Sequence, residues 1–276
     1  MRAALFQMTA VPDVGRNTEA LTNAVAEAAA GGADMLLTPE VSNLLGASRK
    51  LSEELLNLEE DDPTLAAVTA AAKAHGIWVL LGSLALKTGD EDGRFANRSL
   101  LVDDTGEVRA RYDKIHMFDV TLSETETYRE SSAYRPGSEA VTAQTPWGRI
   151  GLTICYDLRF PHLYRALAQA GATILTVPSA FAVPTGQAHW HALLRARAIE
   201  CGAFVLAPAQ TGVHGESRSG PRETYGHSLA VAPWGEVLAD AGTGTGLSFV
   251  DLDMDAVATA RRKIASLTHD RAFTGP

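Results

Sequence analysis

Short apolar runs alternate with longer segments of helical periodicity along all 276 residues. Short apolar runs bounded by turn residues are typical of strands, and longer periodic segments are typical of helices. Strands are therefore expected at 2–8, 33–40, 77–86, 172–180, 203–210 and 246–253. Helices are expected at 18–30, 63–75, 161–170, 187–201 and 254–264. Hairpins with glycine-containing turns are expected at 98–112, 140–157 and 227–242.

This order of elements indicates mixed sheets in a layered α/β protein. Strands that are apolar at successive positions are usually covered on both faces, and their alternation with helices favours stacked layers. Asp62 is placed to cap the helix at 63–75, with Pro63 at its first position. No linker and no shift in composition divides the chain, so we interpret residues 1–276 as one domain.

Composition narrows the classes of function. The formal net charge is −9 and the pI is about 5.4, whereas nucleic-acid and anionic-membrane binders carry clustered Lys and Arg. No apolar run approaches the roughly 18 residues of a membrane helix, and the N-terminal segment lacks the pattern of a secretion signal. Two cysteines are too few for a disulfide framework, and no CxxC motif suggests structural zinc. We therefore expect a cytoplasmic protein without nucleic-acid or membrane partners.

Three ionisable residues, Glu40, Lys114 and Cys155, each lie at the end of an apolar strand that opens into a loop. Strand ends of this kind are where α/β folds assemble sites. A thiol needs a base or a positive field to attack at neutral pH, and a carboxylate and an ammonium would supply them. Spacing alone leaves two interpretations open. Cys155 fits a packed small hydrophobe as well as a nucleophile, and the other two fit solvated charges.

The segments around these residues resemble the signature blocks of a known family. TPEVSN contains Glu40, YDKIHMFDV contains Lys114 and GLTICYDLRFP contains Cys155. All three are similar to blocks of the nitrilase (carbon–nitrogen hydrolase) superfamily. Five further segments resemble its Nit-type amidase branch, namely YRESSAYRPG, VPSAFAVPTGQAHWHALLRARAIE, APAQTG, TYGHS and PWGEVLADAG. The resemblance thus covers essentially the whole chain.

The resemblance implies a cysteine amidase. Cys155 would be the nucleophile, Glu40 the general base and Lys114 the stabiliser of the oxyanion. Glu130, in YRESSAYRPG, matches a second glutamate that orients the lysine and helps to position the substrate. The backbone N–H of Tyr156 would complete the oxyanion hole. Arg159, Phe181 and Thr185 match positions of the substrate pocket, and Arg159 is suited to a substrate carboxylate.

The expected reaction forms a thioester on Cys155, releases ammonia and ends when water activated by Glu40 hydrolyses the thioester. The expected substrate is a small ω-amide with a carboxylate. The segments SAFAVPTG and AHWHALLRARAIE favour deaminated glutathione over α-ketoglutaramate. Nitrilase and N-carbamoyl amidohydrolase activities are alternatives on the same chemistry. A non-catalytic binding protein would be expected to lack one of the four matched catalytic residues, and this chain has all four.

The family fold implied by the resemblance is a four-layer αββα sandwich of mixed sheets, which forms a homodimer and needs no cofactor or metal. Two positions depart from the family pattern. His162 stands where the family often has Glu, and Ala232 stands where it often has Asp before PWG. Both departures bear on substrate choice more than on the class of reaction.

The histidines and the second cysteine are interpreted as structural. His189 and His191 are two positions apart and do not face one another on a helix, so a metal site is not expected there. A metal site is not expected at His214 or His227 either, because the family that the chain resembles needs no metal, and His227 is expected to form structural hydrogen bonds. Cys201 ends an apolar helical pattern and is expected in the core.

Overall fold

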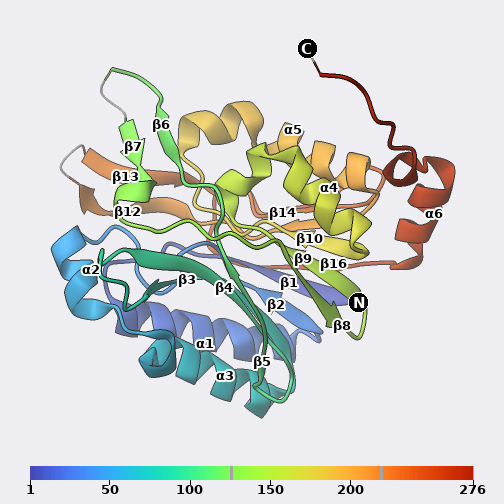
Figure 1. The fold of residues 1–276 in the computed structure, drawn as a ribbon. Helices are drawn as coiled ribbons and strands as arrows, with labels where there is room; N and C mark the ends of the chain where they lie inside the picture. The colour runs from blue at the N-terminus through green and yellow to red at the C-terminus, as the bar shows by residue number, and fades with distance from the viewer. Residues whose placement is uncertain (125–126, 218–219, 276) are drawn as a thin grey trace.

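Alternate side chains of the central strands enter two different hydrophobic cores, which explains why these strands are apolar at successive positions. In the first strand, Ala3 and Leu5 belong to one core and Ala4 to the other. The computed structural model describes residues 1–124, 127–217 and 220–275. Two six-stranded sheets lie face to face between two layers of helices (Figure 1). This confirms the αββα fold class.

The first sheet has the strand order β16-β1-β2-β3-β4-β5. Its strands β1, β2 and β3 pair in parallel, and the remaining neighbours pair antiparallel. In this spatial order the strands span Gly246–Asp251, Arg2–Gln7, Met35–Leu37, Trp78–Lys87, Phe95–Val102 and Val108–Asp113. The sheet is therefore mixed, as expected.

The second sheet has the strand order β15-β14-β11-β10-β9-β8, with parallel pairing among β9, β10 and β11. In this order the strands span Val237–Asp240, Leu229–Val231, Phe204–Ala207, Ala172–Thr176, Gly148–Leu152 and Val141–Thr145. Two separate hairpins are formed by β6 (Asp119–Thr121) with β7 (Thr127–Arg129) and by β12 (Thr211–Ser217) with β13 (Gly220–Tyr225).

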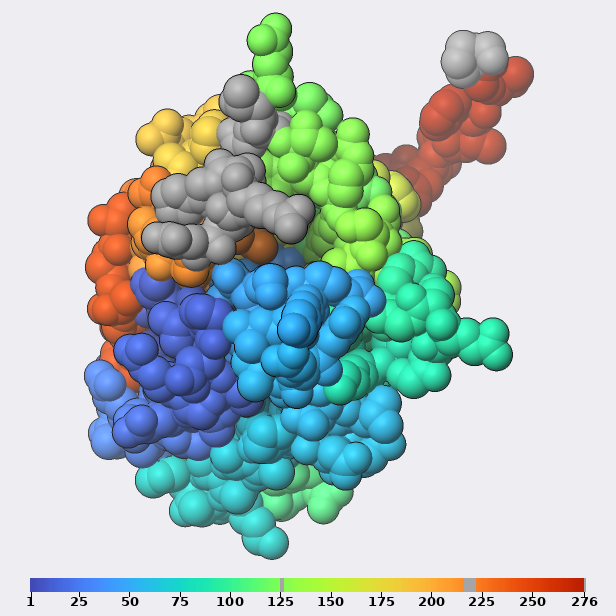
Figure 2. Space-filling view, turned by 90° about the vertical axis from the view of Figure 1, so that its left-hand side faces the viewer, coloured from blue at the N-terminus to red at the C-terminus, as the bar shows by residue number. Residues whose placement is uncertain are grey.

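Helices α1 (Val14–Ala30) and α3 (Pro63–His75) cover the first sheet, and α4 (Pro161–Gln169) and α5 (Val183–Cys201) cover the second (Figure 1). The remaining helices are α2 (Arg49–Leu55) and α6 (Asp255–Lys263), with the 3₁₀ turns η1 (Glu59–Asp61), η2 (Glu130–Ser132), η3 (Cys155–Arg159) and η4 (Ser266–Thr268). After η4 the C-terminal segment extends away from the body (Figures 1 and 2). None of the helices in the described part of the chain has the length and apolar character needed to cross a bilayer.

The local signals for α3 are confirmed. The Asp62 side chain accepts a hydrogen bond from the Leu65 N–H at 2.8 Å, and Pro63 occupies the first position of the helix. Gly76 ends the helix in the left-handed region, with φ of 62°, where a glycine has no steric penalty. The helix therefore begins and ends where its capping residues require.

Two helices begin earlier than expected. The first begins at Val14 instead of residue 18, because the Asp13 side chain caps it through the Arg16 N–H. Helix α5 begins at Val183 instead of residue 187. Its first turn tolerates a proline, and Gly186 allows the helix to touch Tyr225, since an added Cβ would lie 2.3 Å from the Tyr225 Cγ. Helix α2 begins at Arg49, before the solvated helix and loop expected at 53–62, and neither two-stranded hairpin was predicted from the sequence.

Candidate active site

A cavity of about 250 Å³ lies where the loops after β2, β5 and β9 meet. These loops carry Glu40, Lys114 and Cys155, which all line the cavity. The wall is completed from the segment before α2 and from the hairpins β6–β7 and β12–β13. On the face shown in Figure 2, the blue segments around α2 lie beside the green segments of the β6–β7 region. Three sequence-predicted residues therefore meet, although 74 and 41 positions separate Glu40, Lys114 and Cys155 along the chain (114 − 40 and 155 − 114).

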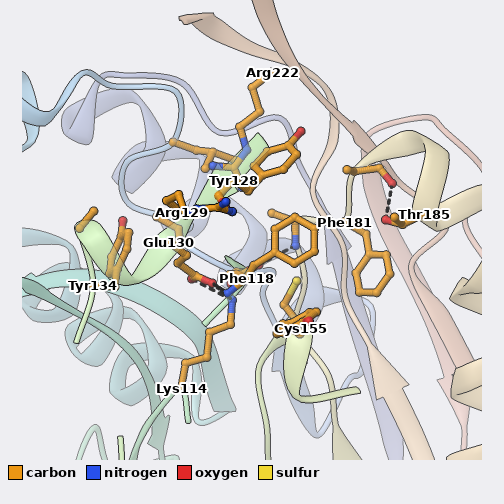
Figure 3. Close-up of a pocket in the computed structure, with 17 residues that line it drawn as sticks. Lys114, Phe118, Tyr128, Arg129, Glu130, Tyr134, Cys155, Phe181, Thr185 and Arg222 are labelled. Carbon is orange, nitrogen blue, oxygen red and sulfur yellow. Dashed lines mark hydrogen bonds and ion pairs between the residues drawn. The ribbon is translucent and has the colours of Figure 1, made fainter. Parts of the chain in front are cut away.

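The ammonium of Lys114 lies between two carboxylates. Its Nζ is 2.8 Å from the Glu40 Oε1 and 2.8 Å from each carboxylate oxygen of Glu130. Figure 3 shows the lysine reaching towards Glu130, with Cys155 beside them. Lys114 and Glu40 are almost fully buried, so this ion pair is poorly screened by solvent. Glu40, Lys114, Glu130 and Cys155 are all expected from the sequence, and the structure brings them together.

Cys155 occupies a strained turn directly after β9. Its φ is 49°, in the left-handed region, and its N–H donates to the Pro178 carbonyl oxygen at 3.0 Å. Val41, which follows Glu40, has φ of 52° although a β-branched residue is disfavoured there. Both residues line the cavity. Strained backbone of this kind persists where the surrounding structure enforces it, commonly at functional sites.

The electrostatics favour a neutral thiol beside an ionised carboxylate. Burial raises the pKa of the Cys155 thiol strongly, and the nearby Glu40 carboxylate adds to the rise. Burial also works to raise the pKa of Glu40, but the Lys114 ammonium and hydrogen bonds from Lys114 and Cys155 lower it overall. Burial opposes the charge of Lys114, yet Glu130 and Glu40 raise its pKa well above the ordinary value. The proton thus resides on sulfur while the carboxylate is free to accept it.

A second layer of polar groups fixes Glu40. Its Oε2 accepts the Ala180 N–H at 2.9 Å and its Oε1 accepts the Asn97 Nδ2 at 2.9 Å. Asn97 also reaches Glu130 at 3.4 Å, and its Oδ1 accepts a hydrogen bond from Ser83. Asn97 and Ser83 were not predicted from the sequence, and both lie inside apolar strands. The sequence feature that could have identified them is a polar residue inside an apolar run, because a buried polar group requires a hydrogen-bond partner.

Hydrogen bonds to the Asp157 side chain fix the turn that holds Cys155. This fully buried carboxylate accepts hydrogen bonds from the Tyr112 hydroxyl at 2.6 Å, the Ile154 N–H at 2.8 Å and the His116 N–H at 3.1 Å. Tyr156 follows Cys155 in the first turn of η3 and lines the cavity. N–H groups in the first turn of a helix lack intrahelical acceptors, which leaves the Tyr156 N–H suited to a ligand oxygen.

The expected pocket residues divide into two groups. Phe181 and Thr185 line the cavity, and the Thr185 hydroxyl donates to the Ala182 carbonyl oxygen at 3.1 Å. Arg159 does not belong to the lining residues found in the described part of the chain. Its guanidinium lies 5.6 Å from the Phe181 ring centroid and 3.3 Å from the His189 Nδ1. Arg159 is therefore next to the wall of the cavity, on an exposed side.

Two other arginines line the cavity and were missed by the sequence analysis. Arg129 lies on β7, where its guanidinium donates to the carbonyl oxygens of Val120 and Tyr128. Arg222 lies on β13, and its charge contributes to lowering the pKa of Glu40. No ion pair found in the described part of the chain involves Arg222. The one available signal was the RETYGHS segment, whose arginine precedes the matched TYGHS block.

Aromatic side chains make up much of the remaining wall. Phe118, Tyr128 and Tyr134 all line the cavity (Figure 3). Burial, with the Glu130 carboxylate, raises the pKa of Tyr134 to about 12, so its hydroxyl keeps its proton near neutral pH. The carboxylates of Glu40 and Glu130 are already bound to Lys114, which makes them poor candidates for holding a metal ion.

The remaining predicted residues have structural positions. Cys201 is fully buried and, like Cys155, is a free cysteine. The His162 ring meets the rings of His116 and Phe160 edge-on, at 5.9 and 6.2 Å between centroids. His162 therefore packs on the outer side of η3. Ala232 is partly buried and packs against the core beneath the second sheet.

A family model described as carbon-nitrogen hydrolase matches residues 2–262. The chain belongs to the carbon–nitrogen hydrolase family, and it is a hydrolase that acts on carbon–nitrogen bonds. This confirms the family resemblance inferred from the motifs. The chain is 40% identical over 241 residues to a deaminated glutathione amidase from Yersinia enterocolitica, covering 87% of this chain and 82% of that protein.

Two solved structures show the same relationship. The NitFhit protein of Caenorhabditis elegans matches with a TM-score of 0.90 and 36% identity, covering 98% of this chain and 65% of that chain. This chain thus spans about two thirds of that fusion protein. An amidase from Nesterenkonia sp. AN1, solved after Michael addition of acrylamide at its active-site cysteine, matches with a TM-score of 0.78 and 29% identity, covering 96% and 98%.

Proposed function

We propose that the chain hydrolyses a small carboxylate-bearing amide through a thioester on Cys155. The single observation that carries this proposal is the buried contact of Lys114 with both Glu40 and Glu130 in the cavity that contains the thiol. A cation held by two carboxylates cannot serve as a solvated surface charge. It provides a fixed positive field where an oxyanion would develop.

The steps follow from the protonation states. Glu40 accepts the thiol proton as the Cys155 sulfur bonds to the amide carbon, so the thiol reacts without first ionising in solvent. Lys114 and the Tyr156 N–H stabilise the oxyanion. The carbon–nitrogen bond then breaks, and Glu40 returns the proton to the leaving nitrogen. Water next attacks the thioester while Glu40 takes its proton. The carbon–sulfur bond then breaks, Glu40 returns the proton to the leaving sulfur, and the acid product ionises to a carboxylate.

The proposed substrate is deaminated glutathione. Relatives at 36–40% identity carry the name deaminated glutathione amidase. Deaminated glutathione carries two carboxylates, and the guanidinium of Arg222 at the cavity supplies a group that binds a carboxylate well. Both amide bonds of deaminated glutathione are secondary, so their hydrolysis releases an amine, and the ammonia expected from the sequence does not fit this substrate. A primary amide such as α-ketoglutaramate would release ammonia instead.

A panel of amides tests this function. The purified chain is mixed with deaminated glutathione, α-ketoglutaramate, an N-carbamoyl amino acid and a simple nitrile, and released amine, ammonia and carbon dioxide are measured. We expect the highest kcat/KM for deaminated glutathione and no product from Cys155→Ala, whose fold is checked by circular dichroism. Carbon dioxide release would identify a carbamoylase. Turnover that persists in Cys155→Ala would contradict the nucleophile assignment.

We also propose that the protein is a cytoplasmic homodimer. Large apolar side chains are exposed on the side of the second sheet, where Ile199 lies against Gly235 and Trp234 is 49% exposed. Exposed apolar patches of this kind are typical of protein interfaces. Light scattering coupled to size-exclusion chromatography tests the homodimer, and a mass of one chain at micromolar concentration would contradict it.

A further inference from the structure

Two histidines and one aspartate form a cluster away from the cavity. His191 lies on α5, His227 precedes β14 and Asp240 ends β15. The His191 Nε2 is 2.9 Å from the Asp240 Oδ2, and the His227 Nδ1 is 2.8 Å from its Oδ1. One donor atom from each residue lies within 4.8 Å of the others. These residues are 36 and 13 positions apart along the chain (227 − 191 and 240 − 227), so no local sequence motif predicts the cluster.

The cluster is held in place by bonds that do not involve its own ring nitrogens. The His227 N–H donates to the Gly242 carbonyl oxygen at 2.6 Å, and the His227 carbonyl oxygen accepts the Trp190 Nε1 at 2.8 Å. Its ring stacks on Tyr225 at 4.4 Å between centroids. Asp240 additionally accepts the Gly242 N–H at 3.0 Å. A ligand at this position would therefore meet groups that are already oriented.

Backbone strain points to the same residue. Within the described ranges, three residues other than glycine have positive φ, namely Val41, Cys155 and His227. The first two line the cavity of the candidate active site. His227 has φ of 56° and lies in the cluster instead. Backbone strain of this kind concentrates at functional positions. We therefore infer that the cluster has a function separate from the candidate active site.

We propose that His191 Nε2, His227 Nδ1 and an Asp240 oxygen bind one divalent transition-metal ion, for which zinc is the natural probe. Two imidazoles and one carboxylate suit zinc and its neighbours, whereas magnesium and calcium prefer oxygen ligands throughout. Three protein ligands leave a fourth tetrahedral position for water. Coordination requires that the His191 Nε2 and the His227 Nδ1 carry no proton, so a neutral ring would hold its proton on the other nitrogen.

The side chains are accessible without being fully exposed, with exposed fractions of 35%, 24% and 33% for His191, His227 and Asp240. A free ion can therefore enter from solvent. This proposal departs from the expectation drawn from the sequence, in which neither His191 nor His227 binds a metal. The structure pairs His191 with distant residues, while His189 lies beside Arg159.

The role of the ion would be structural and not catalytic, because none of its three ligands lines the cavity. It would join α5 to the strands β14 and β15 beside it. Two contacts connect the cluster to the cavity wall. Trp190, bonded to His227, packs on Phe181 at 4.9 Å between ring centroids, and the Tyr225 N–H donates to the Phe181 carbonyl oxygen at 2.9 Å. Metal binding would thus stiffen the wall that carries Phe181 and Thr185.

The experiment is a zinc titration of untagged protein freed of metal by a chelator. After equilibrium dialysis, bound zinc is measured by mass spectrometry in the wild type, His191→Ala, Asp240→Asn and the control His189→Ala. We expect one zinc per chain in the wild type and in the control, and affinity reduced by about tenfold or more in the other two variants. A thermal melt should show a higher midpoint with zinc, only in the proteins that retain the site.

A Cys155→Ala protein is titrated in parallel to exclude zinc bound to the active-site thiol, and it should keep the full stoichiometry. Equal zinc affinity in the wild type, His191→Ala and Asp240→Asn would overturn the proposal, as would loss of zinc in Cys155→Ala or no retention by the wild type at micromolar zinc. Because the readouts are metal content and melting temperature, the result is independent of the proposed amidase function.

Discussion

The Lys114 ammonium and the Glu40 carboxylate form a buried ion pair, with the Nζ 2.8 Å from the Oε1. The same oxygen accepts the Asn97 amide, and the other oxygen accepts the Ala180 N–H. Glu40 therefore has a fixed orientation and a lowered pKa before any substrate binds. In its proposed role as general base, Glu40 needs no rearrangement to accept a proton from the neighbouring thiol.

Replacing Lys114 is expected to damage both stability and catalysis. In Lys114→Met the carboxylates of Glu40 and Glu130 remain buried without their cation, which typically costs about 3–5 kcal/mol of unfolding free energy. Loss of the ammonium that is proposed to stabilise the oxyanion is expected to reduce kcat by about 10²–10³-fold. Urea unfolding and steady-state kinetics measure the two effects. The control Arg111→Met removes a half-exposed ion pair with Glu59 and should cost no more than about 1 kcal/mol.

The pH dependence of the rate reports how the thiol is activated. The lowered pKa of Glu40, the proposed base, keeps its carboxylate ionised at neutral pH, and the raised pKa of Cys155 keeps the thiol protonated well into the alkaline range. The reactive protonation state is therefore constant, and kcat/KM for a neutral amide should be nearly flat between about pH 5 and 8. A profile that climbs about tenfold per pH unit across this range would show that solvent-formed thiolate reacts and that Glu40 is not the base.

The two candidate carboxylate-binding arginines can be separated by kinetics. Arg222→Gln is expected to raise KM for a carboxylate-bearing amide by about tenfold or more, since a charge-assisted contact contributes roughly 1.5–3 kcal/mol. KM for a neutral amide should hardly change in this variant. Arg159→Gln provides the matched comparison, because Arg159 lies outside the cavity lining described above. A selective rise in Arg159→Gln alone would assign the substrate carboxylate to the residue that the motif indicated.

His214 is expected to make the folded state sensitive to mild acid. Its Nδ1 lies 2.8 Å from the Ala10 carbonyl oxygen and its Nε2 2.7 Å from the Thr224 hydroxyl. Burial lowers its pKa from 6.5 to about 4. Between these values the unfolded chain binds a proton that the folded chain does not, so stability falls as pH falls.

The histidine alone should remove about 2 kcal/mol of unfolding free energy between pH 7 and pH 5. Urea titrations at the two pH values measure this loss. His214→Gln should flatten the dependence, whereas His75→Gln, at an exposed helix end, should behave as the wild type. An equal loss in His214→Gln and the wild type would assign the acid sensitivity to other groups.

Short-range chemistry explains which parts of the fold were predictable. The cap at Asp62 and the apolar runs of the central strands act over a few residues, and the structure confirms both. The start of α5 was misplaced because Pro184 and Gly186 are poor helix formers. Only the packed structure shows that Gly186 is needed for contact with Tyr225.

The sequence by itself determined which residues at three strand ends are the catalytic candidates, because Glu40, Lys114 and Cys155 lie in recognisable local segments. Tertiary structure decided what surrounds them. The position of Arg222 at the cavity and the meeting of His191 with Asp240 depend on strand register and on how α5 packs over the second sheet. These relationships join residues far apart in the chain, and no local propensity encodes the distance between them.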